Sequence, residues 1–100
     1  MAGVEFHQVR VLAIEPLTDD AVSVSFDIPT DLSALFDHTP GQHLIVRATV
    51  DGQDVRRSYS ICSAKGATSP SVGIKRLPGG VFSTFVHDTL KIGDTIEVTP

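Results

Sequence analysis

Residues 56–63 (Arg-Arg-Ser-Tyr-Ser-Ile-Cys-Ser) carry more polar chemistry than a strand needs. Two guanidinium groups, one phenol and three hydroxyls occur within this short run. Arginine binds phosphate through two parallel hydrogen bonds, a tyrosine ring packs flat against a ring system, and serine supplies short donor and acceptor groups. These residue types predict a surface for a flat, anionic ligand, with Arg57 toward its phosphate and Tyr59 along its ring.

Two later segments add to this prediction. In residues 73–76 two cations, Lys75 and Arg76, follow strand-like residues, and in residues 78–83 a glycine pair leads into a predicted helix. A helix N-terminus presents unpaired N–H groups and partial positive charge, and glycines let a phosphate approach the backbone. Together with Arg57, this helix start predicts a pyrophosphate site. An aromatic platform beside a pyrophosphate site is what a dinucleotide-like cofactor requires.

Each signal also has a structural explanation. The glycine pair can be an ordinary turn, Tyr59 can belong to the core, and Arg57 can lie on a solvated edge. Lys75 and Arg76 can guard an edge strand against aggregation. We expect Cys62 to be a small buried hydrophobe and Arg56 to be a bystander.

Strand alternation complicates the position of Ser60. An ideal strand puts Arg57 and Tyr59 on one face and Ser58 and Ser60 on the other. Ser60 can share the ligand if the strand twists or ends there, or if its backbone N–H makes the contact. We expect a twist or an end, because residues 61–63 lose strand character.

Hydrophobic alternation predicts the elements that must position these residues. Apolar and polar residues alternate most clearly in residues 21–29. Strands are predicted at residues 9–14, 21–29, 44–50, 55–61, 71–77 and 95–98. Asp51-Gly52 predicts a tight hairpin between the third and fourth of them.

One segment has helical spacing. Phe82, Phe85, Val86 and Leu90 recur at helical intervals, and Ser83 is the predicted N-cap. A second short turn is predicted at residues 31–36. The predicted fold class is all-β, a six-stranded antiparallel Greek-key barrel with one short helix, formed by residues 1–100 as one domain.

Composition and charge exclude several classes of function. The net charge of −4 argues against nucleic acid or an anionic membrane as partner, and the longest apolar run is too short to span a bilayer. The single cysteine excludes an internal disulfide and a four-cysteine iron–sulfur site within these residues. It also fits a reducing compartment, so we expect a cytoplasmic protein. The histidines are scattered, and no metal site is predicted.

The order and spacing of the motifs resemble the flavin-binding domain of the ferredoxin–NADP reductase superfamily. The resemblance covers essentially the whole chain. It includes Pro40-Gly41-Gln42-His43 before a strand, Arg57-Ser58-Tyr59-Ser60, Ile74-Lys75-Arg76, Gly79-Gly80-Val81-Phe82-Ser83 and Gly93-Asp94. Within the superfamily the chain looks most like the reductase components of phenylacetyl-CoA ring-epoxidising oxygenases. Reductases of ketosteroid hydroxylases and of aromatic-ring hydroxylases are near neighbours.

The resemblance implies a role for each motif residue. Arg57 would pair with the flavin phosphates, Tyr59 would pack along the isoalloxazine and ribityl region, and Ser60 would act at the reactive ring nitrogen N5 as the catalytic residue. Further cofactor-binding residues implied by the motifs are Ser58, the backbone of Ile74 and Lys75, and the pyrophosphate-binding residues Gly79, Gly80, Val81, Phe82 and Ser83.

The resemblance also implies what lies outside these residues. The cofactor would be FAD, with FMN as the alternative flavin. NAD(P)H and a [2Fe–2S] cluster would bind elsewhere in a longer parent protein, because this sequence has no G-x-G-x-x-G/A segment and no cluster cysteines. We therefore expect an excised domain of an FAD-dependent oxidoreductase that passes electrons to an oxygenase component.

Two other classes of protein compete with this interpretation. A non-catalytic small-barrel module could use Arg57, Tyr59 and Lys75 to bind a nucleotide. Acidic charge and few aromatic residues argue against a stacking surface for nucleic acid. A purely structural or interaction barrel would carry the same motifs by accident.

Overall fold

A computed structural model describes residues 5–38, 41–63 and 69–100. Pro40 of the Pro-Gly-Gln-His motif lies outside the described residues. The elements, in chain order, are β1 (His7–Thr18), β2 (Ala21–Asp27), the 3-10 helix η1 (Thr30–Leu32), β3 (His43–Val50), β4 (Gln53–Ser60), β5 (Ser71–Lys75), α1 (Val81–Asp88) and β6 (Thr95–Thr99).

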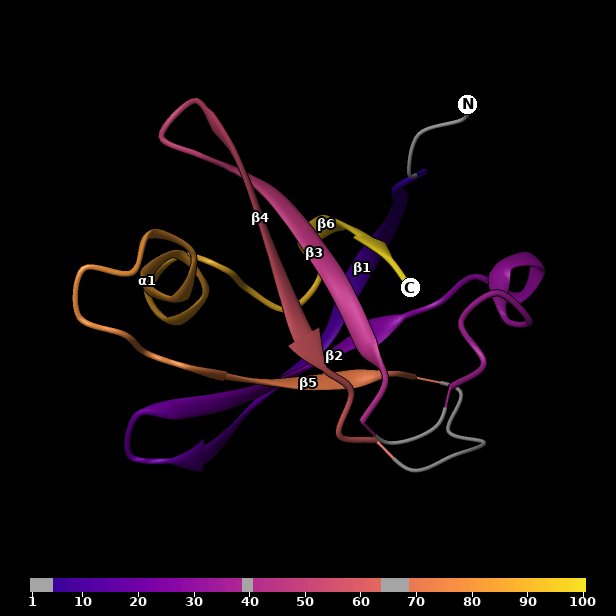
Figure 1. The fold of residues 1–100 in the computed structure, drawn as a ribbon, viewed down its shortest axis with the longest axis horizontal. Helices are drawn as coiled ribbons and strands as arrows, with labels where there is room; N and C mark the ends of the chain where they lie inside the picture. The colour runs from indigo at the N-terminus through magenta and orange to yellow at the C-terminus, as the bar shows by residue number, and fades with distance from the viewer. Residues whose placement is uncertain (1–4, 39–40, 64–68) are drawn as a thin grey trace.

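The strands form one antiparallel sheet in the order β4-β3-β6-β1-β2-β5. The sheet curls until its two edge strands, β4 and β5, meet at a bridge between Ile61 and Val72. Away from that bridge β4 and β5 separate, and α1 lies on the open side (Figure 1). The predicted six-stranded antiparallel class with one helix is confirmed, although the sheet is not a fully closed barrel.

The core fills the inside of the curled sheet. Alternate residues of the strands point inward, as in β2, where Val24 and Phe26 are fully buried. Removal of this apolar surface from water is the main term that stabilises the fold. The buried apolar residues are Val9, Val11, Val24, Phe26, Phe36, Leu44, Val46, Ile61, Val72, Ile74, Phe82, Val86, Leu90, Ile96 and Val98.

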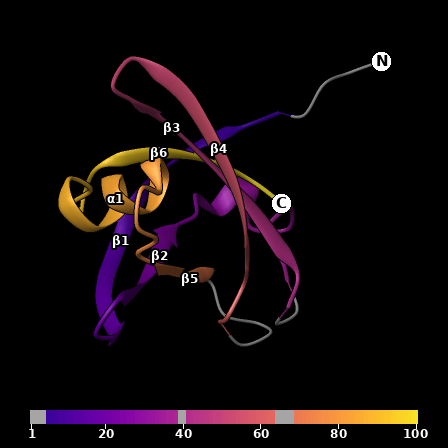
Figure 2. The ribbon, with the colours of Figure 1, turned by 60° about the vertical axis from the view of Figure 1, so that its left-hand side comes forward.

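The hairpin between β3 and β4 confirms the prediction from Asp51-Gly52. Both turn residues have positive φ, 51° at Asp51 and 78° at Gly52, and Val50 pairs with Gln53 across the turn. A two-residue turn of this kind matches the twist of the flanking strands. Figure 2 shows β3 and β4 extending together as a long hairpin.

Strand β1 is longer than the sequence predicted. It runs from His7 to Thr18, beyond the predicted residues 9–14. Its register against β2 shifts between Val11 and Ala13 and again between Pro16 and Thr18. Such irregularities break strict alternation, so a two-residue period could not reveal the second half of this strand.

The prediction of Ser83 as helix N-cap is wrong. The N-cap is Gly80, and α1 begins at Val81. Ser83 is buried in the first turn of the helix, and its hydroxyl bonds to the preceding loop instead of capping the helix. Among the described residues, no helix combines the length and apolar character needed to cross a membrane.

Candidate functional site

A cleft of about 330 Å³ opens where β4 and β5 separate. Three segments distant in sequence form its walls: the second half of β4, the second half of β5 with the loop residue Leu77, and the start of α1. We call it the β4–β5 cleft. Its lining residues are Arg57, Ser58, Tyr59, Gly73, Lys75, Leu77, Gly80, Val81, Phe82 and Ser83.

Three residues expected at the site do not line this cleft. Ile74 is 1% exposed and its side chain belongs to the core. Ser60 ends β4 opposite His43. Gly79 directly precedes the cleft residue Gly80 in sequence, but it lines two neighbouring cavities instead. The other predicted site residues are brought together as the sequence indicated.

Tyr59 forms an aromatic wall of the cleft. It is half-buried, and its ring centroid lies 5.9 Å from that of Phe82, which in turn lies 6.1 Å from that of Phe85. Burial raises the pKa of the phenol, and the nearby Arg57 charge partly opposes that rise. The ring is therefore neutral at physiological pH and held in place by the core beneath it.

Arg57 supplies a cation that has no carboxylate partner in the described part of the chain. Its guanidinium Nη1 donates to the Arg56 carbonyl at 2.7 Å. Within residues 5–38, 41–63 and 69–100, Arg47, Arg56 and Arg76 form ion pairs with carboxylates, whereas Arg57 forms none. Its positive charge is therefore available to an anionic ligand.

Lys75 faces the cleft from the opposite wall. Its ammonium lies 3.7 Å from the Asp20 carboxylate, and both side chains are exposed. An exposed pair at that distance is weak, so Lys75 also contributes positive charge to the cleft.

The backbone of β4 brings Ser60 to the edge of the cleft. The N–H of Ile61 donates to the Gln42 carbonyl in the direction of β3, and the N–H of Cys62 donates to Ser71 in the direction of β5. Because N–H directions alternate along a strand, the N–H groups of Ser58 and Ser60 also point toward β5. The strand ends at Ser60 as expected, yet the Ser60 side chain does not line the cleft. Only its backbone N–H offers a contact there.

The first turn of α1 closes the far end of the cleft. The N–H groups in the first turn of a helix lack acceptors within the helix and carry partial positive charge. Val81 and Phe82 belong to this first turn and line the cleft together with Arg57 and Lys75. The combination of cations, helix N-terminus and aromatic ring suits a ligand that joins a phosphate to a flat ring system.

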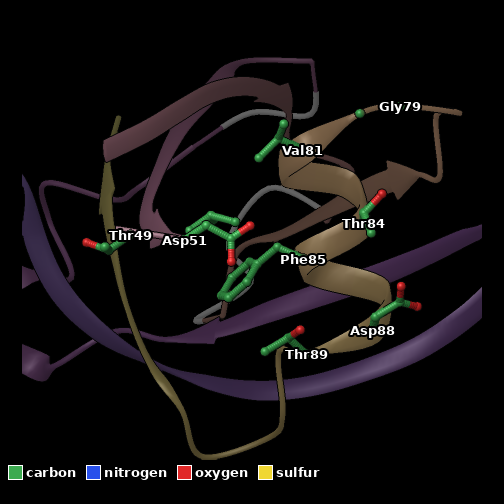
Figure 3. Close-up of a pocket in the computed structure, with 10 residues that line it drawn as sticks. Thr49, Asp51, Gly79, Val81, Thr84, Phe85, Asp88 and Thr89 are labelled. Atoms are coloured by element: carbon green, nitrogen blue, oxygen red, sulfur yellow. The ribbon is translucent and has the colours of Figure 1, made fainter. Parts of the chain in front are cut away.

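A larger cavity of about 510 Å³ lies between the β3–β4 turn and α1 (Figure 3). It shares Gly80 and Val81 with the cleft. Figure 3 shows the Asp51 carboxylate and the Phe85 ring facing this space. Its lining includes carboxylates and threonine hydroxyls but no cation. Negative charge disfavours a phosphate there, so the smaller cleft is the better anion site.

The structure corrects one expectation about this region and adds two residues to it. Cys62 is exposed, not buried, because it follows the end of β4, and its thiol donates to the Ser71 carbonyl at 3.4 Å. Gly73 and Leu77 line the cleft, although neither was predicted to be a cofactor-binding residue. The glycine inside a strand pattern was the signal that could have identified Gly73.

No metal centre emerges among the described residues, where no group of three or more His, Cys, Asp or Glu side chains is placed to hold an ion. His38 is 4% exposed, with Nδ1 3.1 Å from the Phe36 carbonyl and Nε2 2.8 Å from the Ser63 hydroxyl. These contacts satisfy both ring nitrogens, so His38 has a structural role.

Comparison with known proteins identifies the family. The chain belongs to the oxidoreductase FAD-binding domain family, whose model matches residues 8–100. This confirms the resemblance to the ferredoxin–NADP reductase superfamily, and FAD is the cofactor of the family. The cations and the aromatic ring of the β4–β5 cleft suit the phosphate and ring groups of such a cofactor.

Individual relatives agree with this assignment. The chain is 39% identical over 93 residues to a component of the 1,2-phenylacetyl-CoA epoxidase of Escherichia coli, and the match covers 93% of this chain and 26% of that protein. It is 38% identical over 93 residues to the glycine betaine monooxygenase reductase subunit of Pseudomonas aeruginosa, covering 92% and 25%. The chain therefore spans about a quarter of the length of these relatives.

Solved structures share the fold. The FAD/NAD-binding domain of nitric oxide dioxygenase from Vibrio cholerae superposes with a TM-score of 0.81 at 23% identity, covering 92% of this chain and 41% of that one. The ferredoxin reductase of carbazole 1,9a-dioxygenase superposes with a TM-score of 0.77 at 28% identity, covering 97% and 29%.

Proposed function

We propose that this chain binds FAD in the β4–β5 cleft and is the flavin-binding part of an NAD(P)H-dependent electron-transfer reductase. The observation that carries the proposal is the convergence of Arg57, Tyr59, Lys75 and the first turn of α1 on one cleft, in a chain of the FAD-binding family. When bound, the flavin supplies the electron-transfer chemistry, and the protein supplies orientation and electrostatic environment.

The chain's own residues would divide the work along the cleft. Arg57, Lys75 and the backbone at the start of α1 bind the phosphates. Tyr59 holds the ring system against the core, and the β5-facing edge of β4 at Ser58 and Ser60 contacts the polar edge of the ring. Ser60 would contact the reacting part of the ring through its backbone N–H. Gly79 shapes the loop, and the Ile74 backbone contributes only to the β5 wall.

The parent protein would deliver electrons to an oxygenase. Of the relatives named above, one is the reductase of a monooxygenase and the other is a component of an epoxidase. The 39% identity to the epoxidase component favours a phenylacetyl-CoA epoxidase system, and reductases of other hydroxylases are the alternative. The nicotinamide-binding and [2Fe–2S] parts would lie outside these residues in the parent protein. We place this parent protein in the cytoplasm.

Direct titration with flavin tests this function. The purified chain is mixed with FAD or FMN, and flavin absorption, fluorescence and co-elution on gel filtration are measured. We expect a shifted flavin spectrum and retained FAD, with tighter binding of FAD than of FMN. Unshifted spectra and no retention would reject the proposal. Salt-sensitive binding of an oligonucleotide, or no ligand at all for a well-folded protein, would instead favour the competing classes.

A further inference from the structure

Ser83 closes the loop that joins β5 to α1. Its Oγ accepts a hydrogen bond from the Leu77 N–H at 3.0 Å and can donate to the Gly80 carbonyl at 3.4 Å. The residue is 5% exposed. The hydroxyl therefore lies on the inner side of residues 77–83, which we call the Leu77–Ser83 loop, and both of its bonds stabilise that loop.

The two glycines of the loop are needed for different reasons. The Gly80 N–H donates to the Leu77 carbonyl at 2.8 Å, and Gly79 has a φ of 73°. Pro78 and Gly79 thus occupy the central positions of a type II turn, where the second position requires positive φ. Gly80 has an ordinary φ of −75°, so its backbone conformation does not require glycine.

Gly80 instead leaves space for the Ser83 hydroxyl. A Cβ added at Gly80 would lie 2.7 Å from Ser83 Oγ and 3.0 Å from the Leu77 carbonyl oxygen. Real side chains do not approach so closely, so an added methyl group would displace the serine. The absence of a side chain at Gly80 therefore makes room for the Ser83 hydroxyl, and the hydroxyl in turn bonds to the loop that contains Gly80.

We propose that Ser83 is a positioning residue, which holds the Leu77–Ser83 loop so that the Val81 and Phe82 N–H groups face the β4–β5 cleft, and that this role does not depend on a contact between its hydroxyl and the flavin. The nature of the bound anion rests on the proposed function. The loop role rests only on the contacts above. Backbone N–H groups cannot move independently of their loop, so loosening the loop weakens the anion site even without the loss of a direct contact between the hydroxyl and the anion.

Amide hydrogen exchange separates this role from direct binding. In the flavin-free Ser83→Ala variant, we expect the Leu77 amide to exchange about tenfold faster, as for loss of one hydrogen bond, and FAD affinity to fall. Thr84→Ala is the matched control, because Thr84 is the next residue and is exposed on α1. It should change neither quantity.

Weaker FAD binding with unchanged Leu77 exchange would overturn the inference, because the hydroxyl would then be a ligand. Faster exchange of the Leu77 amide with unchanged FAD binding would also overturn the inference, because the loop that Ser83 holds would then not contribute to FAD binding. If the wild-type chain binds no FAD, the proposed function is wrong. The statement that the loop positions backbone N–H groups for a flavin is then wrong as well. The exchange result still decides the loop role.

A double-mutant cycle tests the link between Gly80 and Ser83 without any flavin. Gly80→Ala should lower the unfolding midpoint in the wild-type background. It should lower it less in the Ser83→Ala background, because the contact at 2.7 Å is then absent. A residual loss is expected from the Leu77 carbonyl. Equal losses in the two backgrounds would show that Gly80 is not there to accommodate Ser83.

Discussion

Adjacent arginines on β4 have different surroundings, and this difference decides which of them can bind a ligand. Arg56 pairs with Asp54 at 3.1 Å, and its guanidinium lies 5.1 Å from the centre of the Phe6 ring. Arg57 has no carboxylate partner among the described residues and lines the cleft. Consecutive strand residues point to opposite faces, so two residues of the same type can differ in function.

Replacing Arg57 should weaken FAD binding specifically. Loss of a charge-assisted phosphate contact in Arg57→Ala should reduce the binding free energy by about 1.5–3 kcal/mol, on the order of tenfold to a hundredfold in Kd. Fluorescence titration of FAD measures the change, with Arg56→Ala as the matched control. Equal effects of the two substitutions would indicate a general charge effect and not a contact.

The Tyr59 phenol should link stability to pH only in alkaline solution. Burial raises its pKa in the folded state above the ordinary value of 10.0, so it binds its proton more tightly when folded. Below that value the phenol is neutral in both states and has no effect. As pH rises above it, the unfolded state ionises first and the free energy of unfolding falls. Urea unfolding of wild type and Tyr59→Phe should show a larger alkaline loss in the wild type, and parallel curves would contradict this.

At the scale of elements, the loop between β5 and α1 determines where the helix begins. Its turn at Pro78 and Gly79, the Ser83 hydroxyl, and an ion pair from Arg76 to Asp88 together connect the end of β5 to both ends of α1. An eight-residue helix is too short to be stable alone, so it depends on these contacts and on the burial of Phe82 and Val86 in the core. The helix start is therefore a property of the loop as much as of the helix.

The Arg76–Asp88 pair should stabilise this arrangement only when Asp88 is ionised. The hydrogen bond from Arg76 lowers the pKa of Asp88 below its ordinary value of 3.8, so the stabilisation is present above that value and is lost as pH falls through the lower folded pKa. Asp88→Asn should lower the thermal midpoint slightly near neutral pH, because the pair is exposed. The difference from wild type should vanish in strong acid. A difference that persists there would point to a cause other than charge.

At the scale of the whole molecule, the sheet is open where the cofactor would bind. The edge strands meet at Ile61 and Val72 and then diverge. The cleft therefore lies between two strand edges that are not hydrogen-bonded to each other. The net charge of −4 opposes anion binding at long range, so the local cations of the cleft must provide the attraction.

The isolated chain should bind FAD without being an efficient NADH oxidase. The proposed function places the nicotinamide site in another part of the parent protein, so NADH oxidation by the FAD-loaded chain should not exceed that of free FAD. Absorbance at the NADH band in the presence of an electron acceptor measures this. Turnover in the usual enzymatic range, on the order of 1–1000 per second, would place a nicotinamide site within these residues.

The sequence by itself determined the number of strands, most of their positions and the motif residues. Alternation located β2 and β3, Asp51-Gly52 located the hairpin that joins β3 to β4, and Arg57, Tyr59 and the glycine pair indicated an anionic, aromatic ligand. These signals are local, because side-chain direction and turn geometry depend on a few neighbouring residues.

The tertiary structure alone decided how these residues work together. The separation of β4 and β5, the exposure of Cys62 and the direction of the Ser60 N–H depend on how the curled sheet closes at Ile61 and Val72. Ser83 looked like a helix cap because cap preference is local, but its partner, Leu77, is defined only by the folded loop. Contacts between distant segments are set by packing and sheet twist, which no local pattern encodes.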